Sequence, residues 1–199
     1  MKIYVCSSNS GKLWEILLAA KGTNFEIEPL PHLKSIVPPE ETGRTFEENA
    51  SLKALYYSRF TSEIVLADDS GLEVDVLGGA PGVWSARYSG PEATDEANNN
   101  TLLRNLGSAT MRSAHFVCVV ALARSGEILR TARGAVEGEI LPAPQGTNGF
   151  GYDPLFFYPP LNRSFAELSP DEKLMASHRG KALRALFEKA DAIVMKANT

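Results

Sequence analysis

The chain has 199 residues, of which 44% are hydrophobic and 22% are charged, an ordinary composition for a globular protein with one sizeable core or with two lobes that share one sheet. Its 24 acidic and 20 basic residues give a net charge of −4, so no general positive field attracts nucleic acid. Only two cysteines, no signal-peptide pattern and no apolar run of the ~18 residues that span a bilayer lead us to expect a cytoplasmic protein without membrane contact.

The first half of the chain shows the periodicities of alternating strands and helices. Apolar residues from Leu13 to Ala20 recur at helical spacing. Thr45 and Glu48 form a capping box that predicts the start of a second helix. The predicted elements are a strand at 2–6, a helix at 10–21, a possible strand at 25–28, a proline-rich loop at 29–44 and a helix at 45–60.

The second half is predicted to begin with two short strands, at 64–67 and 72–76, separated by an Asp-Asp-Ser-Gly segment. Thr94 and Ser169 are typical helix caps. The remaining predicted elements are a helix at 94–106, strands at 115–123 and 128–139, a glycine-rich loop at 146–153 and helices from 169 and at 179–196. No internal repeat or linker interrupts this pattern, so we expect one α/β domain over residues 1–199.

The segment between the two predicted strands carries the strongest chemical signal. Asp68 and Asp69 are adjacent carboxylates, followed by Ser70 and Gly71. Carboxylates at a strand end suit the binding of Mg²⁺ against an anionic substrate. All four residue types also favour turns, so a turn without a catalytic role is the alternative.

A turn of small residues follows the first predicted strand and opens a helix. At such a position, free backbone N–H groups and the helix dipole attract anions. Lys12 adds a positive charge, although the spacing is not that of a Walker A loop. A simple helix cap is the alternative. The candidate anion-binding residues are Ser7, Ser8, Asn9, Ser10, Gly11 and Lys12.

Three other groups place charged or aromatic residues in loops or at helix ends. Glu40 lies in the proline-rich loop, where a carboxylate can reach a metal, and Asn49 and Lys53 share one helix face. An aromatic ring between the glycines of the 149–153 loop suits base stacking, with a core aromatic as the alternative. The third group, near a helix junction, contains Lys173, His178 and Arg179.

In this order, the groups resemble the inosine triphosphate pyrophosphatase family (RdgB-like), which removes aberrant purine nucleoside triphosphates. The strings Asp-Asp-Ser-Gly-Leu-Glu-Val-Asp, Gly-Gly-Ala-Pro-Gly and Ser-Ala-Arg-Tyr-Ser-Gly are highly specific. Ser7 and Ser8 depart from the pattern, where a Thr-Gly pair is commoner. The resemblance implies an α/β fold with an elongated, mixed, twisted sheet flanked by helices, two lobes with a central cleft, and a homodimer. The matching runs are Ser7–Lys12 with Glu15, Glu40–Lys53, Ala67–Gly90, Phe150–Pro154 and Asp171–Lys181.

The resemblance also implies hydrolysis of dITP, ITP or XTP to the monophosphate and pyrophosphate. On this basis, we expect Mg²⁺ to lie between Glu40, Asp69 and the triphosphate. Asp69, alone or with Asp68, would accept the proton of the attacking water, and Lys53 completes the catalytic set. Substrate contacts are expected from residues 7–12 and from Ser70, Phe150, Gly151, Tyr152, Asp153, Lys173, His178 and Arg179.

Within the substrate-binding set, the lysines at 12, 53 and 173 are expected to pair with phosphate oxygens. Phe150 would stack on the purine, while His178 and Arg179 would donate hydrogen bonds to a 6-oxo group. Adenine carries an amino group at that position and would leave those donors unpaired. The residues that exclude guanine are not indicated.

Two other functions fit parts of the pattern. One is a related nucleotide pyrophosphatase of Maf type, which shares the broad fold and prefers other nucleotides. The other is a purine-nucleotide sensor that binds without turnover. Glu40, Asp68 and Asp69 argue against a sensor, because binding alone requires cations and stacking but no carboxylate pair for a metal.

Overall fold

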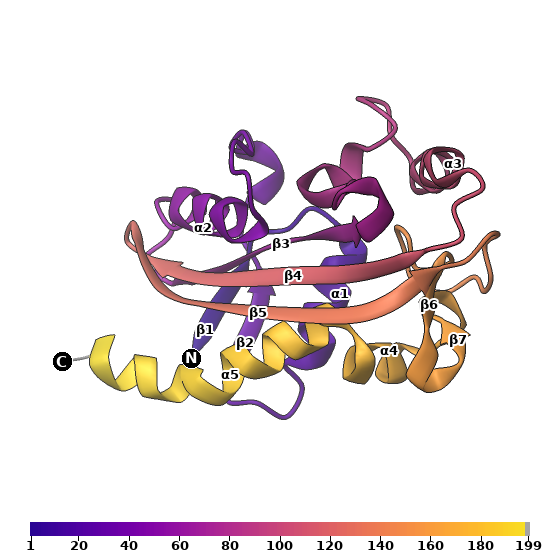
Figure 1. Ribbon diagram of the computed structural model, residues 1–199. Coiled ribbons are helices and arrows are strands. Elements are labelled where there is room, and N and C mark those ends of the chain that lie inside the picture. The colour runs from indigo at the N-terminus through magenta and orange to yellow at the C-terminus, as the bar shows by residue number, and fades with distance from the viewer. Residues whose placement is uncertain (198–199) are drawn as a thin grey trace. The chain divides into compact units, whose positions relative to one another are not determined.

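The computed structural model describes the backbone of residues 1–197 and the side chains of residues 1–188. Its seven-stranded mixed sheet has the strand order β2–β1–β3–β4–β5–β6–β7 (Figure 1). β1 pairs in parallel with β2 and β3, whereas β6 pairs antiparallel with β5 and β7. The strands are β1 (Lys2–Val5), β2 (Glu26–Pro29), β3 (Ile64–Val74), β4 (Ser113–Arg124), β5 (Glu127–Ile140), β6 (Phe156–Tyr158) and β7 (Arg163–Ser164).

Five α-helices accompany these strands in the described part of the chain, and three of them start at the caps that the sequence predicts. Thr45, Thr94 and Ser169 each accept a hydrogen bond from a backbone N–H group in the first turn of their helix. No helix among the described residues is long and apolar enough to cross a membrane. The helices are α1 (Ser10–Ala19), α2 (Phe46–Tyr57), α3 (Asp95–Leu106), α4 (Pro170–Ala176) and α5 (His178–Ala197).

The mixed, twisted sheet with flanking helices confirms the predicted fold class. Contacts between residues divide the chain into two compact units, each with its own apolar core. The single domain over residues 1–199 and the cleft between two lobes stay predictions. Unit 1 comprises Met1–Asp69, Cys118–Gly134 and the chain from His178 onward, and unit 2 comprises Ser70–Val117 and Ala135–Ser177.

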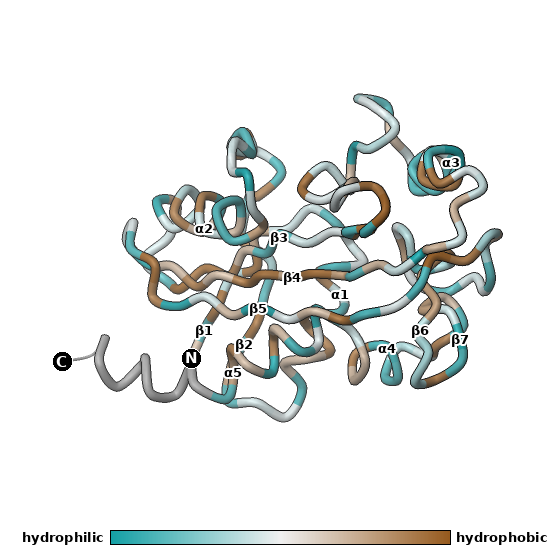
Figure 2. Tube along the Cα trace, in the orientation of Figure 1, coloured by the Kyte–Doolittle hydropathy of each residue, from teal (hydrophilic) through white to brown (hydrophobic). Residues whose placement is uncertain are grey.

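In unit 1, α1 and α5 pack together on one face of the sheet, and α2 lies on the other (Figure 1). Ile16 of α1 and Leu183 of α5 share a buried cluster with Val5 of β1 and Leu66 of β3. In unit 2, α3 buries Leu102 against the apolar side chains of its own core. The apolar stretches of the strands that supply these cores are brown in Figure 2.

One predicted element differs from the structure in a way that matters for the site. We expected two strands, at 64–67 and 72–76, with Asp68 and Asp69 between them. The structure has one continuous strand, β3, which contains both acids and ends at Val74. The physical reason is that both carboxylates find cationic partners while the backbone stays extended, so no turn is needed to expose them to water.

Candidate active site

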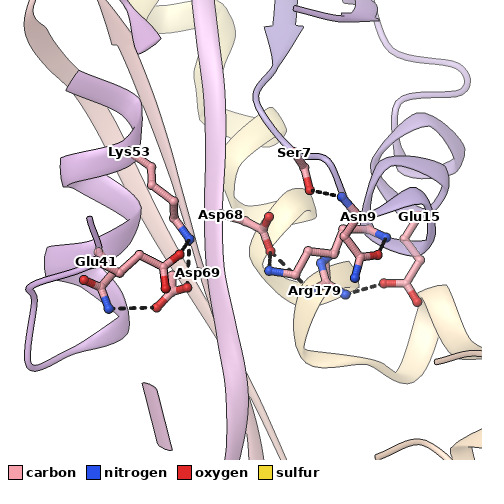
Figure 3. A network of polar contacts seen from close by, with 10 residues as sticks. Ser7, Asn9, Glu15, Glu41, Lys53, Asp68, Asp69 and Arg179 are labelled. Atoms are coloured by element: carbon pink, nitrogen blue, oxygen red, sulfur yellow. Dashed lines mark hydrogen bonds and ion pairs between the residues drawn. The ribbon is translucent and has the colours of Figure 1, made fainter. Parts of the chain in front are cut away.

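The two acids of β3 point to opposite faces of the strand. Successive side chains alternate along an extended backbone, so adjacent residues cannot share a face. Figure 3 shows Asp68 on the side of Asn9, Glu15 and Arg179, and Asp69 on the side of Lys53 and Glu41. The acidic pair therefore forms two separate ion-pair clusters within unit 1.

Asp68 lies in the more deeply buried of these clusters. Its Oδ2 atom lies 3.1 Å from the Nζ atom of Lys12 and accepts a hydrogen bond from Nη2 of Arg179 at 3.3 Å. Arg179 in turn donates through Nη1 to Oε2 of Glu15 at 2.5 Å. Asp68, Arg179 and Glu15 are 4%, 1% and 5% exposed, so these charges depend on one another for solvation.

The pKa values of this cluster follow from its contacts. Burial works to raise the pKa of Asp68, but the positive charges of Lys12 and Arg179 outweigh it and hold that pKa well below its ordinary value. Burial likewise opposes the charge of Arg179, yet Glu15 and Asp68 raise its pKa. The two cations therefore favour the ionised form of Asp68, an arrangement that suits structure and positioning better than proton transfer.

Lys12 reaches Asp68 because β1 and β3 run in parallel. Val5 is in register with Leu66, so the turn after β1 emerges beside the acidic part of β3. Asn9 caps α1 by accepting a hydrogen bond from the N–H group of Lys12 at 3.0 Å. Ser7 accepts one from the N–H group of Asn9 at 3.3 Å. The side chains of residues 8–10 are exposed, which leaves this helix N-terminus open to an anion.

Asp69 faces α2 and the loop before it. Its Oδ1 atom accepts a hydrogen bond from Nζ of Lys53 at 2.8 Å, and its Oδ2 atom accepts one from Nδ2 of Asn49 at 3.3 Å. Burial raises the pKa of Asp69 above its ordinary value, and the opposing charge of Lys53 does not cancel that effect. Asp69 thus has the more basic carboxylate of the two, as a proton acceptor requires.

Asn49 is itself held in place by the preceding loop. Its Oδ1 atom accepts a hydrogen bond from the N–H group of Gly43 at 2.8 Å, and the side chain is fully buried. A Cβ atom on Gly43 would lie 2.5 Å from that same Oδ1 atom, so only glycine leaves room for this contact. Asn49 is not among the predicted site residues, although its position four residues before Lys53 on one helix face indicates that the two side chains are neighbours.

The carboxylate that meets Lys53 from the loop belongs to Glu41, the neighbour of the predicted metal ligand Glu40. Nζ of Lys53 lies 3.0 Å from Oε1 of Glu41, while the Glu40 side chain is exposed and forms no ion pair in the described part of the chain. Burial lowers the pKa of Lys53, but the charges of Asp69, Asp68 and Glu41 outweigh it and raise that pKa. No three His, Cys, Asp or Glu side chains among the described residues gather closely enough to hold a metal by themselves.

The predicted base-binding loop belongs to unit 2. Oδ2 of Asp153 accepts hydrogen bonds from the N–H group of Phe150 at 2.9 Å and from Nζ of Lys173 at 2.5 Å. The same Nζ atom lies 4.5 Å from the centre of the Phe150 ring. Lys173 thus lies over the aromatic ring that is expected to stack on the base, and its expected contact with phosphate stays a prediction.

The predicted site residues are divided between the two units. Ser7–Lys12, Glu40, Lys53, Asp68, Asp69, His178 and Arg179 belong to unit 1, whereas Ser70, Phe150–Asp153 and Lys173 belong to unit 2. His178 and Arg179 begin α5 and are 5% and 1% exposed. Because the guanidinium of Arg179 is enclosed by carboxylates, its expected contact with a base stays a prediction.

Comparison with known proteins gives matches over almost the whole chain. Residues 3–189 match the model of the Ham1 family. A dITP/XTP pyrophosphatase from Exiguobacterium sp. is 53% identical over 187 residues, covering 94% of this chain and 95% of that protein. A dITP/XTP pyrophosphatase from Acidobacterium capsulatum is 50% identical over 196 residues, covering 94% of this chain and 97% of that protein. The solved structure of a HAM1 protein from Coxiella burnetii is 41% identical with a TM-score of 0.87, covering 96% of this chain and 99% of that chain.

Proposed function

Because this chain belongs to the Ham1 family, we propose that it hydrolyses aberrant purine nucleoside triphosphates, namely dITP, ITP and XTP, to the monophosphate and pyrophosphate. The family match agrees with the resemblance to inosine triphosphate pyrophosphatases drawn from the motifs, and relatives about half identical to this chain are named for this activity. The observation that carries the proposal is Asp69, a buried carboxylate of β3 that accepts hydrogen bonds from both Lys53 and Asn49.

In this proposal, Asp69 accepts the proton of the water that attacks the phosphate. Its two hydrogen bonds fix the direction of its carboxylate, as a proton acceptor for a positioned water requires. Asp68 does not share this role, because its carboxylate lies on the other face of β3 and is neutralised by Lys12 and Arg179. Of the two expected arrangements, Asp69 alone or Asp69 with Asp68, we therefore propose the first.

The phosphates are proposed to bind where free N–H groups and cations coincide. The N-terminus of α1 offers backbone donors and the partial positive charge of the helix, with Lys12 in its first turn. Ser7 and Asn9 provide side chains at the same turn. On the other face of β3, Lys53 supplies a second cation, which neutralises charge that develops on the phosphates during hydrolysis.

Mg²⁺ is proposed as the cofactor, held by Asp69 and Glu40. The donor chemistry fits, because Mg²⁺ prefers oxygen ligands and uses only one or two carboxylates when substrate phosphates complete its shell. The carboxylates of Asp69 and Glu41 both pair with one cation, the Lys53 ammonium. Their negative charges therefore already stabilise a positive charge beside Asp69. When bound, Mg²⁺ neutralises phosphate charge and orients water. Glu41 keeps Lys53 in place beside that position.

Base recognition is proposed to rest on the loop at 149–153. Phe150 offers a ring face for stacking, and the ammonium of Lys173, held by Asp153, lies beside that ring as a hydrogen-bond donor. A donor at this place favours a 6-oxo purine over adenine, which presents an amino group there. His178 remains a proposed second donor to the base.

Two further features are proposed on more general grounds. The family resemblance supports a homodimer. The two cysteines, Cys6 and Cys118, are free and buried, which suits a reducing compartment such as the cytoplasm. Burial raises the pKa of both thiols to about 12, so they stay protonated and unreactive near neutral pH.

The proposal is tested by measuring pyrophosphate release from ITP, with and without excess EDTA. ATP, dTTP and UTP are tested separately as alternative substrates. We expect release from ITP that EDTA abolishes, with ATP turned over at least ~10³-fold more slowly. Preference for dTTP or UTP would favour a Maf-type enzyme instead. Binding of ITP without turnover would favour a sensor.

A further inference from the structure

The first two turns of α3 hold the backbone of Gly151, the residue that follows Phe150. Oδ2 of Asp95 accepts a hydrogen bond from the N–H group of Gly151 at 2.6 Å. One helical turn later, Nδ2 of Asn99 donates to the carbonyl oxygen of the same glycine at 2.9 Å. Both polar groups of one residue are therefore bound by side chains four positions apart on one helix face.

The same loop is fixed from its inner side by Asp153. Its carboxylate accepts the N–H group of Phe150 and would collide with any Cβ atom on Gly149, at 2.1 Å from Oδ2. Gly149 and Gly151 have φ angles of +76° and +61°, a backbone conformation that other residues rarely adopt. Phe150 thus lies between two glycines in this conformation, and the loop backbone is bound on both sides of its ring.

α3 is a firm support for this contact. Leu102 and Leu106 of α3 are buried in the same apolar cluster as Tyr152, which follows the held glycine. The hydroxyl of Tyr152 donates to the carbonyl oxygen of Ser85 at 2.8 Å. The helix and the loop therefore share a core, and a hydrogen bond between them joins two well-packed elements rather than two mobile ones.

We propose that Asp95 and Asn99 are positioning residues that hold Phe150 in the orientation required to stack on the purine base. This inference rests on the proposed function, because it assigns a base to the Phe150 ring. The two residues act through hydrogen bonds to the Gly151 backbone and take no part in the proposed hydrolytic step. Their loss should therefore weaken base binding and base discrimination while leaving the hydrolytic step intact.

The variants can separate positioning from helix stability. Asp95→Asn keeps an acceptor oxygen for the N–H group of Gly151, whereas Asp95→Ala removes it. Asn99→Leu removes the donor and also an Oδ1 atom that is buried without a hydrogen-bond partner among the described residues, so it should cost little stability. Glu96→Ala, a loss of charge in the same first turn, and Asn100→Leu, the same change at an exposed position, serve as controls.

Steady-state kinetics with ITP and ATP then give the readout. We expect KM for ITP to rise about 5- to 10-fold in Asp95→Ala and Asn99→Leu, as the loss of one hydrogen bond predicts, with kcat changed less than about twofold. Asp95→Asn should recover most of the affinity, and both controls should match the wild type. A fall in melting temperature with unchanged KM would mean a structural role only and would overturn the proposal.

A double-mutant cycle with Phe150→Ala tests whether Asn99 affects the KM for ITP through the Phe150 ring. If α3 acts through the ring, Asn99→Leu should raise KM little further once the ring is gone. Fully additive effects would contradict the inference. Hydrogen exchange of the Gly151 amide, expected to speed up in Asp95→Ala but not in Glu96→Ala, tests the contact without any substrate. If the Gly151 amide exchanges faster in Asp95→Ala but the wild-type protein does not hydrolyse ITP, the proposed function is wrong and the contact between α3 and the loop is still confirmed.

Discussion

Asp68 and Asp69 are adjacent in sequence but separated by the plane of β3, and each is neutralised by a different lysine. Asp68 pairs with Lys12 at 3.1 Å, and Asp69 pairs with Lys53 at 2.8 Å. Alternation along a strand thus gives two neighbouring carboxylates opposite pKa shifts, lowered for Asp68 and raised for Asp69. The two acids should consequently respond very differently to the same substitution.

Asp68→Asn should act mainly on stability. Removing the carboxylate leaves the buried guanidinium of Arg179 with one acidic partner fewer, and breaking a buried ion pair from one side costs about 3–5 kcal/mol. Urea denaturation should therefore show a large loss in the free energy of unfolding. Asp75→Asn, which removes an exposed aspartate, is the control and should change that free energy little. Equal losses in the two variants would show that the Asp68 cluster does not stabilise the fold.

Gly43→Ala should disturb Asp69 from a distance. The added methyl group would overlap Oδ1 of Asn49, so Asn49 must shift and its hydrogen bond to Asp69 is lost. We expect a fall in kcat for ITP of about tenfold, as for one displaced hydrogen bond to a charged group. Gly22→Ala is the comparison for a general loss of stability, because its methyl group meets no atom within 4 Å but the φ of +80° strains the alanine backbone; it should lower the melting temperature without lowering kcat. Normal turnover by a folded Gly43→Ala protein would show that Asn49 does not orient the carboxylate of Asp69.

Glu40→Gln should weaken the response to Mg²⁺. If Glu40 is a ligand, the Mg²⁺ concentration that gives half-maximal activity should rise by about tenfold or more, since even outer-shell changes have effects of this size. Glu41→Gln is the informative comparison, because Glu41 pairs with Lys53 beside the proposed metal position. A larger shift in Glu41→Gln than in Glu40→Gln would reassign the second metal carboxylate to Glu41.

Much of the fold was accessible from the sequence, because caps and periodicity are local. Thr45, Thr94 and Ser169 start helices as predicted, since a capping side chain bonds within its own first turn. The pairing of charges was not accessible. Arg179 meets Asp68 across 111 residues and Glu15 across 164, and no local spacing indicates which cation reaches which carboxylate. The continuous course of β3 was not predicted for the same reason. Only the distant cationic partners allow Asp68 and Asp69 to be buried within an extended strand.

Glu172→Gln should change how stability depends on pH. Hydrogen bonds from Arg163, and from the backbone and side chain of Ser169, lower the pKa of Glu172 to about 2 from an ordinary 4.5. A lowered carboxylate pKa adds stability above pH 4.5 that is lost as pH falls toward 2. The melting temperature of Glu172→Gln should therefore fall less steeply over this range than that of the wild type. Asp171→Asn, a change of an exposed acid in the same turn, is the control and should keep the wild-type dependence of melting temperature on pH. An unchanged dependence in Glu172→Gln would show that the ionisation of Glu172 does not contribute to stability.

The role of Asp69 is tested most directly by single-turnover hydrolysis of ITP in Mg²⁺ by Asp69→Asn, with folding checked by circular dichroism. The amide keeps the size of the side chain and can still accept a hydrogen bond from Lys53, but it cannot take a proton from water. We predict a rate of pyrophosphate formation lower by at least ~10²-fold in a fully folded protein. A folded Asp69→Asn protein that forms pyrophosphate at a rate close to that of the wild type would contradict the assignment of this carboxylate as the base.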